Sequence, residues 1–294
     1  MIIWLASYPR SGNTLLRTII KSCFDISSFA DEPVNYESEF RTNPDLIGHN
    51  EYEGNWAAFY QEAALKKDVV LIKTHLPPKD DSPYIYVVRD GRSAIQSYRK
   101  FNRDYNRVEK TLTSLILGDD AYGDWSSHYV KWNRRPVSKR VVLKFDDLVD
   151  MSEETLKKIT SVLGDRKPVR DWKNPVEDLA KYEPNFFNKR SPVFHPMEDW
   201  TSLHQQLFDK YHGPLMAELG FYESIPKSSA NGKQENEIFL NDIFHTYKKL
   251  IEEKSFLTNA CEERLALINK LQETCDERLA LINQLHNAER PDTE

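Results

Sequence analysis

Residues 2–14 read IIWLASYPRSGNT, and this stretch decides the fold. Its first half is apolar and rich in β-branched and aromatic side chains, which predicts a buried strand over Ile2–Ser7. Its second half combines Pro9 and Gly12 with hydroxyl side chains, which predicts a loop leading into a helix over Leu15–Phe24. Such a loop presents backbone N–H groups at a helix N-terminus, where phosphate binds well. The Walker A pattern G-x-x-x-x-G-K-[ST] is absent, however, and a purely structural turn explains the stretch equally well.

Three further apolar runs are also short and rich in β-branched or aromatic residues: Val69–Thr74, Tyr84–Arg89 and Val141–Phe145. Helical patterns separate them, the clearest being Ser93–Asn106 and Ser152–Gly164. This alternation predicts an α/β fold in which a P-loop-like parallel sheet is flanked by helices and followed by a long C-terminal helix. Residues 25–65 show no clear period, and we expect helical pieces and loops there.

The composition narrows the class of protein. The chain has 294 residues, a hydrophobic fraction of 39% and a net charge of −6. These values fit a globular protein and predict no nucleic-acid partner. The three cysteines, Cys23, Cys261 and Cys275, form neither a disulfide framework nor a zinc motif, which predicts a reducing, cytoplasmic location. No run approaches the roughly 20 apolar residues that a membrane span needs.

We expect a catalytic domain over residues 1–223, a linker over 224–236 and a helical tail over 237–290. In the tail, CEERLALINKLQET at 261–274 repeats as CDERLALINQLHNA at 275–288. Apolar residues recur there about every 3.5 residues and form one seam. Its members are Cys261, Leu265, Ile268, Leu271, Cys275, Leu279, Ile282 and Leu285. The seam predicts a coiled coil through which residues 237–290 form a homo-oligomer; the alternative is a single helix folded back on the domain.

Two more motifs place polar groups at the ends of expected strands. Arg89 ends one strand, and Ser97 follows eight residues later on the next helix, so the two side chains could share one phosphate. Lys73 and His75 end another strand and project from the same side of an extended chain. Each motif also has a structural explanation, because Arg89 could pair with an acid and His75 could satisfy a hydrogen bond in the core.

The three motifs YPRSGNT (8–14), KTHLP (73–77) and VVRDGRSAIQSY (87–98), in this order, strongly resemble those of the sulfotransferases that use 3′-phosphoadenosine 5′-phosphosulfate (PAPS). WSSHYVKW at 125–132 and VLKFDDL at 142–148 are similar to later segments of that family. The resemblance covers roughly residues 1–222 and leaves out the tail. It implies a sulfuryl donor, PAPS, a product, 3′,5′-adenosine bisphosphate (PAP), and a reaction that requires no metal.

The resemblance also assigns roles to individual residues. The residues that would hold the 5′-phosphosulfate are Arg10, Ser11, Gly12, Asn13 and Thr14. Arg89 and Ser97 would hold the 3′-phosphate, and His75 would be the general base. Lys73 and Arg10 would stabilise the charge of the leaving group. Further contacts to the nucleotide would come from Phe145 and from the closing triplet Lys189, Arg190 and Ser191.

The sequence departs from the family pattern at several of these positions. Arg10 replaces the usual Lys, so a planar guanidinium group with several hydrogen-bond donors replaces a compact ammonium charge. Leu15 replaces a Trp that stacks on adenine, and Phe145 replaces a Tyr, which removes a hydroxyl group near the nucleotide. The closing triplet Lys189, Arg190 and Ser191 lacks the Gly of the family's Arg-Lys-Gly.

The acceptor is specified least. The reaction implies a hydroxyl or amine group, and the polar, acidic and aromatic character of residues 25–65 favours a saccharide or a small metabolite. Glu32 and His128 are the side chains that we expect to face it. Two other functions remain open: a P-loop-type kinase of a nucleotide or small molecule, and a nucleotide-binding scaffold that acts through its coiled coil. Magnesium-dependent ATP binding would indicate the kinase.

Overall fold

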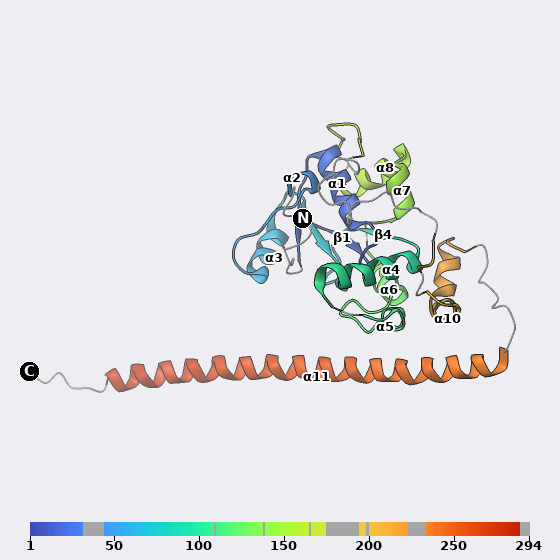
Figure 1. The fold of residues 1–294 in the computed structure, drawn as a ribbon. Coiled ribbons are helices and arrows are strands. Elements are labelled where there is room, and N and C mark those ends of the chain that lie inside the picture. Colours follow the sequence, from blue (N-terminus) through green and yellow to red (C-terminus); the bar gives the residue numbers. More distant parts are fainter. Residues whose placement is uncertain are drawn as a thin grey trace, which may run out of the picture. The chain divides into compact units, whose positions relative to one another are not determined.

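The computed structural model describes residues 1–31, 44–108, 110–137, 139–164, 166–174, 194–197, 200–222 and 233–288. It divides into two compact units, Met1–Ser229 and Ala230–Glu294. The first unit holds a sheet with its covering helices, and the second holds one long helix (Figure 1).

The first unit is built on a parallel sheet of five strands in the order β2-β3-β1-β4-β5. The strands are β1 (Ile2–Ser7), β2 (Ser28–Ala30), β3 (Val70–Thr74), β4 (Tyr84–Val88) and β5 (Arg140–Lys144). The parallel α/β fold is therefore confirmed, and four strands lie where the apolar runs predict them. The fifth, β2, has only three residues and no apolar run, so the sequence pattern gives no sign of it.

One face of the sheet is covered by α1 (Asn13–Phe24), α7 (Phe145–Asp150) and α8 (Glu153–Val162) (Figure 1). Alternate residues of the central strands point to this face, as the two-residue period of a strand requires. They form one buried cluster with the helices; its strand members are Ile3, Leu5, Leu71, Ile85, Val87 and Leu143. This apolar layer fixes α1 behind β1, and so fixes the loop between them.

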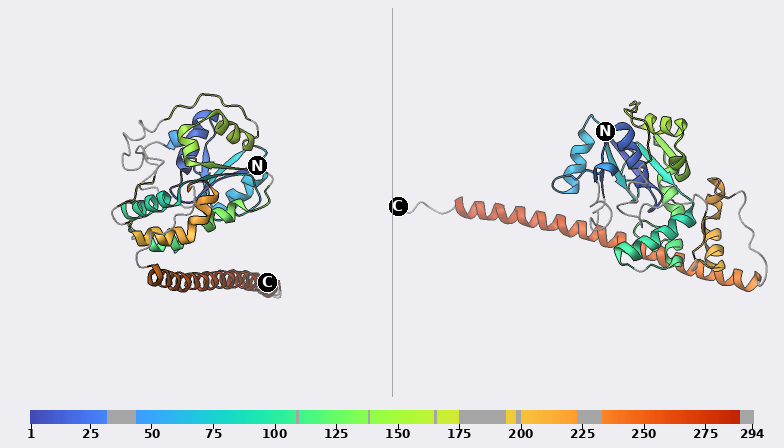
Figure 2. Two further views of the ribbon diagram at one scale, coloured as in Figure 1. Left: turned by 90° about the vertical axis from the view of Figure 1, so that its right-hand side faces the viewer. Right: turned by 45° about the horizontal axis from the view of Figure 1, so that its top comes forward.

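Aromatic side chains dominate the opposite face. Trp4 of β1 stacks on Tyr60 of α3 (Trp56–Leu65), and Tyr84 of β4 packs edge-on against Trp132 of α6 (Trp125–Asn133). The remaining helices of this unit are α2 (Pro44–Ile47), α4 (Gly91–Phe101), α5 (Leu112–Leu117) and α10 (Ser202–Glu218). Contacts join α4, α5, α6 and α10 in one group, which the views in Figure 2 show from two further sides.

Helix boundaries differ from the sequence expectation where capping groups decide them. The Asp90 carboxylate accepts hydrogen bonds from the backbone N–H groups of Arg92 and Ser93, so α4 begins at Gly91 rather than at Ser93. At its far end the α-helix gives way to a π-helical turn over Asn102–Asn106.

Phe145 was expected to end a strand but instead opens α7. The Asp147 carboxylate accepts a hydrogen bond of 2.9 Å from the backbone N–H of Lys144, and this cap begins a helix directly after β5.

The second unit consists of α11 (Lys233–Ala288), an uninterrupted helix of 56 residues. At 1.5 Å per residue its length is roughly 80 Å. Among the described residues, no helix is both long enough and apolar enough to cross a membrane.

Candidate active site

The predicted site residues follow the carboxyl ends of four neighbouring strands. Each strand of the parallel sheet runs in the same direction, so the segments that follow β1, β3, β4 and β5 meet at one edge. The loop Tyr8–Gly12 follows β1, His75 follows β3, Arg89 follows β4 and Phe145 follows β5. The topology therefore brings together groups that lie more than 130 residues apart in the chain.

The loop after β1 is held in an unusual backbone conformation. Arg10 has φ of 63° and Gly12 has φ of 112°, both in the left-handed region. A Cβ atom on Gly12 would lie 2.6 Å from Cδ2 of Phe145, too close for any side chain. Gly12 therefore lets the loop press against the Phe145 ring, and α1 begins at the next residue. The backbone N–H groups of the first turn of α1 are thus presented at the end of the sheet.

Two guanidinium groups meet at this loop. Arg89 donates a hydrogen bond of 3.3 Å from Nη1 to the backbone carbonyl of Arg10, and its guanidinium lies 4.7 Å from the centre of the Phe145 ring. Arg10 contacts Ser97 Oγ at 3.5 Å through Nε, and its guanidinium stacks on Phe101. Arg10 therefore lies beside both Arg89 and Ser97. The motif spacing predicts that Arg89 and Ser97 share one site, but it assigns Arg10 to the other phosphate group.

Burial of Arg89, and secondly its repulsion by Arg10, lowers the pKa of Arg89 to about 10. Its side chain still carries its positive charge at neutral pH, although only 7% of the residue is exposed. A buried cation beside a second cation is stabilised by an anion placed between them. The electrostatics of this edge of the sheet therefore suit a phosphate or sulfate group.

Ser11 supplies a further polar group in the loop. Its Oγ is fully buried and makes no hydrogen bond among the described residues. Such an atom is costly to bury without a partner, and an anion oxygen would provide one. Asn13 behaves differently, because its side-chain amide donates to the carbonyl of Leu5 and to Ser7 Oγ. What Asn13 can offer an anion is the backbone N–H of the first helical turn.

His75 is oriented by the strand beside it. Its Nδ1 lies 2.7 Å from the backbone carbonyl oxygen of Ser7 and 3.3 Å from Ser7 Oγ. A carbonyl oxygen only accepts hydrogen bonds, so Nδ1 must carry the proton and Nε2 carries the lone pair of the neutral ring. The imidazole is thereby fixed in the tautomer that can accept a proton at Nε2.

His128 does not lie at an open acceptor surface, contrary to the expectation from sequence. It is only 1% exposed, and both ring nitrogens are bonded within the core. Nε2 donates to the backbone carbonyl of His75 at 2.8 Å, and Nδ1 accepts from the Tyr86 hydroxyl at 2.7 Å. Tyr86 lies on β4 between Ile85 and Val87, so it faces the opposite side of the sheet. The strand pattern predicts that side, but it does not predict the hydrogen bond to His128.

The remaining predicted site residues are Lys73, Glu32, Lys189, Arg190 and Ser191. Lys73 is partly buried at the end of β3 and contributes to lowering the pKa of His49 to about 4, after burial and Arg17. Glu32, Lys189, Arg190 and Ser191 lie outside the described residues. Two neighbours of the site carry no signal in the sequence motifs. The Phe101 ring lies against the Arg10 guanidinium, and the Tyr122 ring packs edge-on against His75, with centroids 5.8 Å apart. Tyr122 lies in a loop without a motif.

The aromatic side chains of residues 29–60 form a cluster of their own. Phe59 packs against Phe29, Tyr52 and Trp56, with ring centroids 4.6, 4.7 and 5.7 Å away. Lys79 lies over the Trp56 ring at 4.6 Å. Much of this aromatic surface is therefore buried by contacts among the rings themselves.

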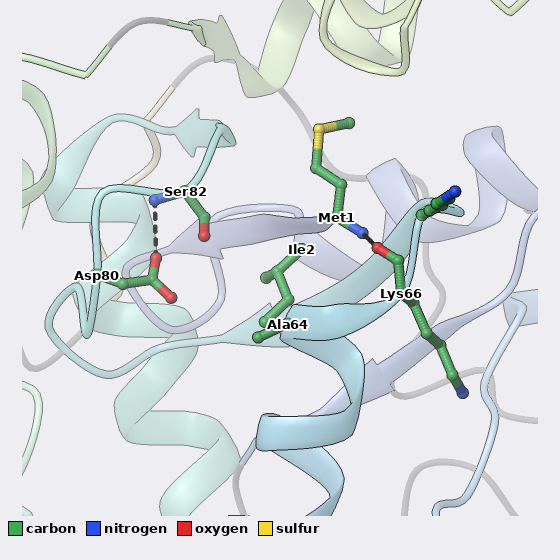
Figure 3. A pocket seen from close by; sticks show the side chains of 7 residues that line it. Met1, Ile2, Ala64, Lys66, Asp80 and Ser82 are labelled. Atoms are coloured by element: carbon green, nitrogen blue, oxygen red, sulfur yellow. Dashed lines mark hydrogen bonds between the residues drawn. The ribbon is translucent and has the colours of Figure 1, made fainter.

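A separate pocket of about 420 Å³ opens at the other end of the strands (Figure 3). It is lined by Met1, Ile2, Ala64, Lys66, Lys67, Asp80 and Ser82. The N-terminal ammonium of Met1 donates to the carbonyl of Lys66 beside it. These residues lie before β1, β3 and β4 or at the first residue of β1. The pocket therefore lies at the amino ends of the strands, whereas the site described above lies at their carboxyl ends. Among the described residues, no group of three or more His, Cys, Asp or Glu side chains could hold a metal ion.

Comparison with known proteins shows one family. The family model described as sulfotransferase domain matches residues 2–187. A solved structure of the mouse sulfotransferase SULT7A1 complexed with PAP is 20% identical over 75% of this chain and 86% of its own, with a TM-score of 0.48.

A second structure, of retinol dehydratase with androsterone and the inactive cofactor PAP, is 16% identical over 64% of each chain, with a TM-score of 0.41. A third, of retinol dehydratase with retinol and PAP, is 14% identical over 86% of this chain and 80% of its own, with a TM-score of 0.35. No curated protein matches the sequence.

Proposed function

The chain belongs to the sulfotransferase family and transfers a sulfuryl group, and from that premise we propose that its donor is PAPS, its acceptor carries a hydroxyl or amine group, and His75 is the general base. The observation that carries this proposal is the meeting of Arg10, Arg89 and Ser97 at the loop before α1. The buried, unpartnered Ser11 Oγ and the close packing of Gly12 support the same use of the loop.

The two phosphate-bearing ends of PAPS would be divided between these groups. The first turn of α1, with Ser11 and Thr14, would hold the 5′-phosphosulfate, where the helix dipole favours negative charge. Arg89 and Ser97 would hold the 3′-phosphate, and Phe145 would lie beside the nucleotide. Lys73 and Arg10 would stabilise the charge that develops on the departing phosphate oxygen.

The proton transfer follows from the tautomer of His75. As the acceptor oxygen or nitrogen forms its bond to sulfur, the bond from sulfur to the 5′-phosphate breaks and its electron pair stays on PAP. The acceptor proton moves to Nε2 of His75, because Nδ1 already carries a proton. The resulting imidazolium donates to the Ser7 carbonyl, which stabilises it. This sequence of bond changes needs no covalent intermediate on the protein.

We infer a saccharide or a small polar metabolite as the acceptor class. The described aromatic rings of residues 29–60 pack on one another, so they offer less flat surface to a phenol than their number in the sequence indicates. Glu32, which we propose faces the acceptor, directly follows Asp31, a buried carboxylate bonded to Thr74 and Lys79.

The proposal is tested by donor binding and by turnover. PAP is expected to raise the melting temperature without magnesium, and protein mixed with PAPS and panels of glycans, phenols, lipids and metabolites is expected to release PAP with some of them. Chromatography of PAP measures the reaction. A protein that ignores PAP but binds ATP with magnesium would instead be a kinase, and one that binds PAP but never releases it from PAPS with any acceptor would be a scaffold.

We assign His128 a positioning role rather than contact with the acceptor. Its hydrogen bond to the His75 carbonyl and its bond to Tyr86 tie the general base to the sheet. His128→Phe leaves both partners unsatisfied, at about 1–3 kcal/mol each. We therefore expect a lower melting temperature and a roughly tenfold lower kcat, with the donor KM nearly unchanged.

His212 offers a matched control for this prediction. It is also fully buried, with Nε2 2.9 Å from the Ile116 carbonyl and Nδ1 2.7 Å from Ser126 Oγ, but it does not touch His75. His212→Phe should lose similar stability and keep its kcat. Equal losses of kcat in the two variants would make His128 merely structural.

We further propose that the tail, residues 237–290, associates with other copies of the chain, and that the protein works in a reducing, cytoplasmic environment. Its cysteines are all unpaired thiols in the structure.

A further inference from the structure

The helix α11 carries a stripe of apolar side chains that are more than half exposed. Leu265, Ile268, Leu279 and Ile282 are 59%, 54%, 57% and 51% exposed. Cys261 and Cys275 are exposed thiols on the same stripe. Large apolar groups in such a continuous row indicate a surface that another chain covers.

The 14-residue repeat places this stripe in a heptad register. With Leu265 at position a, Leu279 is also at a, while Cys261, Ile268, Cys275 and Ile282 are at d. A strict 3.5-residue period keeps the seam facing helices that supercoil with it, whereas a helix lying on a globular domain drifts towards 3.6. The repeat therefore favours other coiled-coil helices as the partner, and the repeated segment itself is the one with the matching period.

The polar residues at a positions decide how the copies align. Gln272 occupies an a position near the end of the first repeat, and Thr258 and His286 are two heptads before and after it. In a parallel, in-register coil Gln272 meets Gln272 of the other copies, and an amide can both donate to and accept from its like. In an antiparallel coil an a layer meets a d layer, so Gln272 would face Cys261, Ile268 or Cys275. Parallel alignment satisfies the amide by pairing it with its like, and a polar residue at an a position is a known means of fixing register.

The apolar residues decide the number of copies. Each repeat contains one Leu at a and one Ile at d, the combination that favours tetramers over dimers, and a Cys fills its other d position. The stripe also includes Leu257 and Leu271 at g, which are 62% and 57% exposed. A stripe widened from a and d to g suits a bundle in which each helix contacts two neighbours.

We propose that α11 forms a parallel, in-register coiled coil of four copies of this chain, with Cys261 facing Cys261 and Cys275 facing Cys275. The inference is independent of the donor, the acceptor and the role of His75.

Single-cysteine variants of the full chain test the alignment. Cys275→Ser keeps Cys261, and Cys261→Ser keeps Cys275; each is treated with oxidised glutathione, which takes up the two electrons and two protons that two thiols release. Both variants should form disulfide-linked dimers on a non-reducing gel. Failure of either single-cysteine variant to form this dimer would contradict the parallel, in-register alignment and overturn the proposal. The double variant keeps only the buried Cys23 and should not be linked.

Light scattering on a sizing column tests the number of copies. The full chain should have about four times the mass of the monomer, and a monomer, dimer or trimer would contradict the proposal. Ile268→Asp should dissociate the assembly, whereas Leu267→Asp should not. The two residues are adjacent and equally exposed, at 54% and 58%, but Leu267 is at position c, outside the seam. Dissociation by both variants would show that any added charge is disruptive and would overturn the register.

Discussion

His75→Ala is expected to lower kcat by about 10²–10⁴-fold, the range in which a positioned general base contributes. The bond from Nδ1 to the Ser7 carbonyl leaves Nε2 as the proton acceptor, and alanine removes that acceptor. The groups expected to bind the donor lie elsewhere on the loop and on α4, so the dissociation constant of PAP should change less than threefold. Single-turnover kinetics and calorimetry with PAP measure the two quantities.

His195→Ala is the control for this experiment, since the side chain of His195 is exposed. It should keep full activity. A His75→Ala protein that turns over within twofold of the unmodified enzyme would exclude His75 as the base. Loss of PAP binding together with activity would instead mean that His75 holds the loop in place.

Arg89→Met is expected to weaken PAP binding by about 10–100-fold, because hydrogen bonds to charged groups contribute about 1.5–3 kcal/mol. Without ligand, the same change should not lower the melting temperature. Folding depresses the pKa of Arg89 from 12.5 to about 10, so the charged form is disfavoured in the fold. The charged form therefore lowers the free energy of unfolding by about 3 kcal/mol at neutral pH. This destabilisation disappears as the pH rises above 10. Methionine removes the charge, and its side chain can still pack over Phe145.

Thermal unfolding with and without PAP separates these two effects. Arg103→Met is the control, because that arginine belongs to the same basic region of the chain but its side chain is 59% exposed. It should leave both the melting temperature and the PAP-induced rise unchanged. If Arg89→Met kept the full rise with PAP, Arg89 would have no part in binding the 3′-phosphate.

The strands could be predicted wherever burial produces an unbroken apolar run. β1 is buried along its whole length, and its predicted and observed bounds coincide. β2 could not be found, because three residues, Ser28–Ala30, carry no period and are held by pairing with β3. Capping groups such as Asp90 and Asp147 set the boundaries that were shifted, and their effect depends on side-chain geometry.

The site was predictable where a residue sits at the end of a strand, because parallel topology brings such positions together. The Arg10 loop, His75 and Arg89 each follow such a strand end, whereas the contacts of Arg10 with Arg89 and Ser97 were not predicted. His128 illustrates the limit: its sequence context places it on a helix, but only the packing of α6 against β4 shows that it bonds to the His75 carbonyl. Tyr122 illustrates another, since a residue in a loop without a motif is placed by tertiary contacts alone.

The partner that selects the His75 tautomer is a main-chain oxygen, that of Ser7, and the oxygen that His128 holds is the main-chain oxygen of His75 itself. No amino-acid substitution removes either oxygen, because every residue has a main-chain carbonyl group. A substitution can therefore remove the imidazole or shift the strand beside it. It cannot remove the carbonyl oxygen that keeps the proton on Nδ1 rather than on Nε2. Over evolutionary time, the chemistry of this group is tied to the geometry of the sheet rather than to the identity of its neighbours.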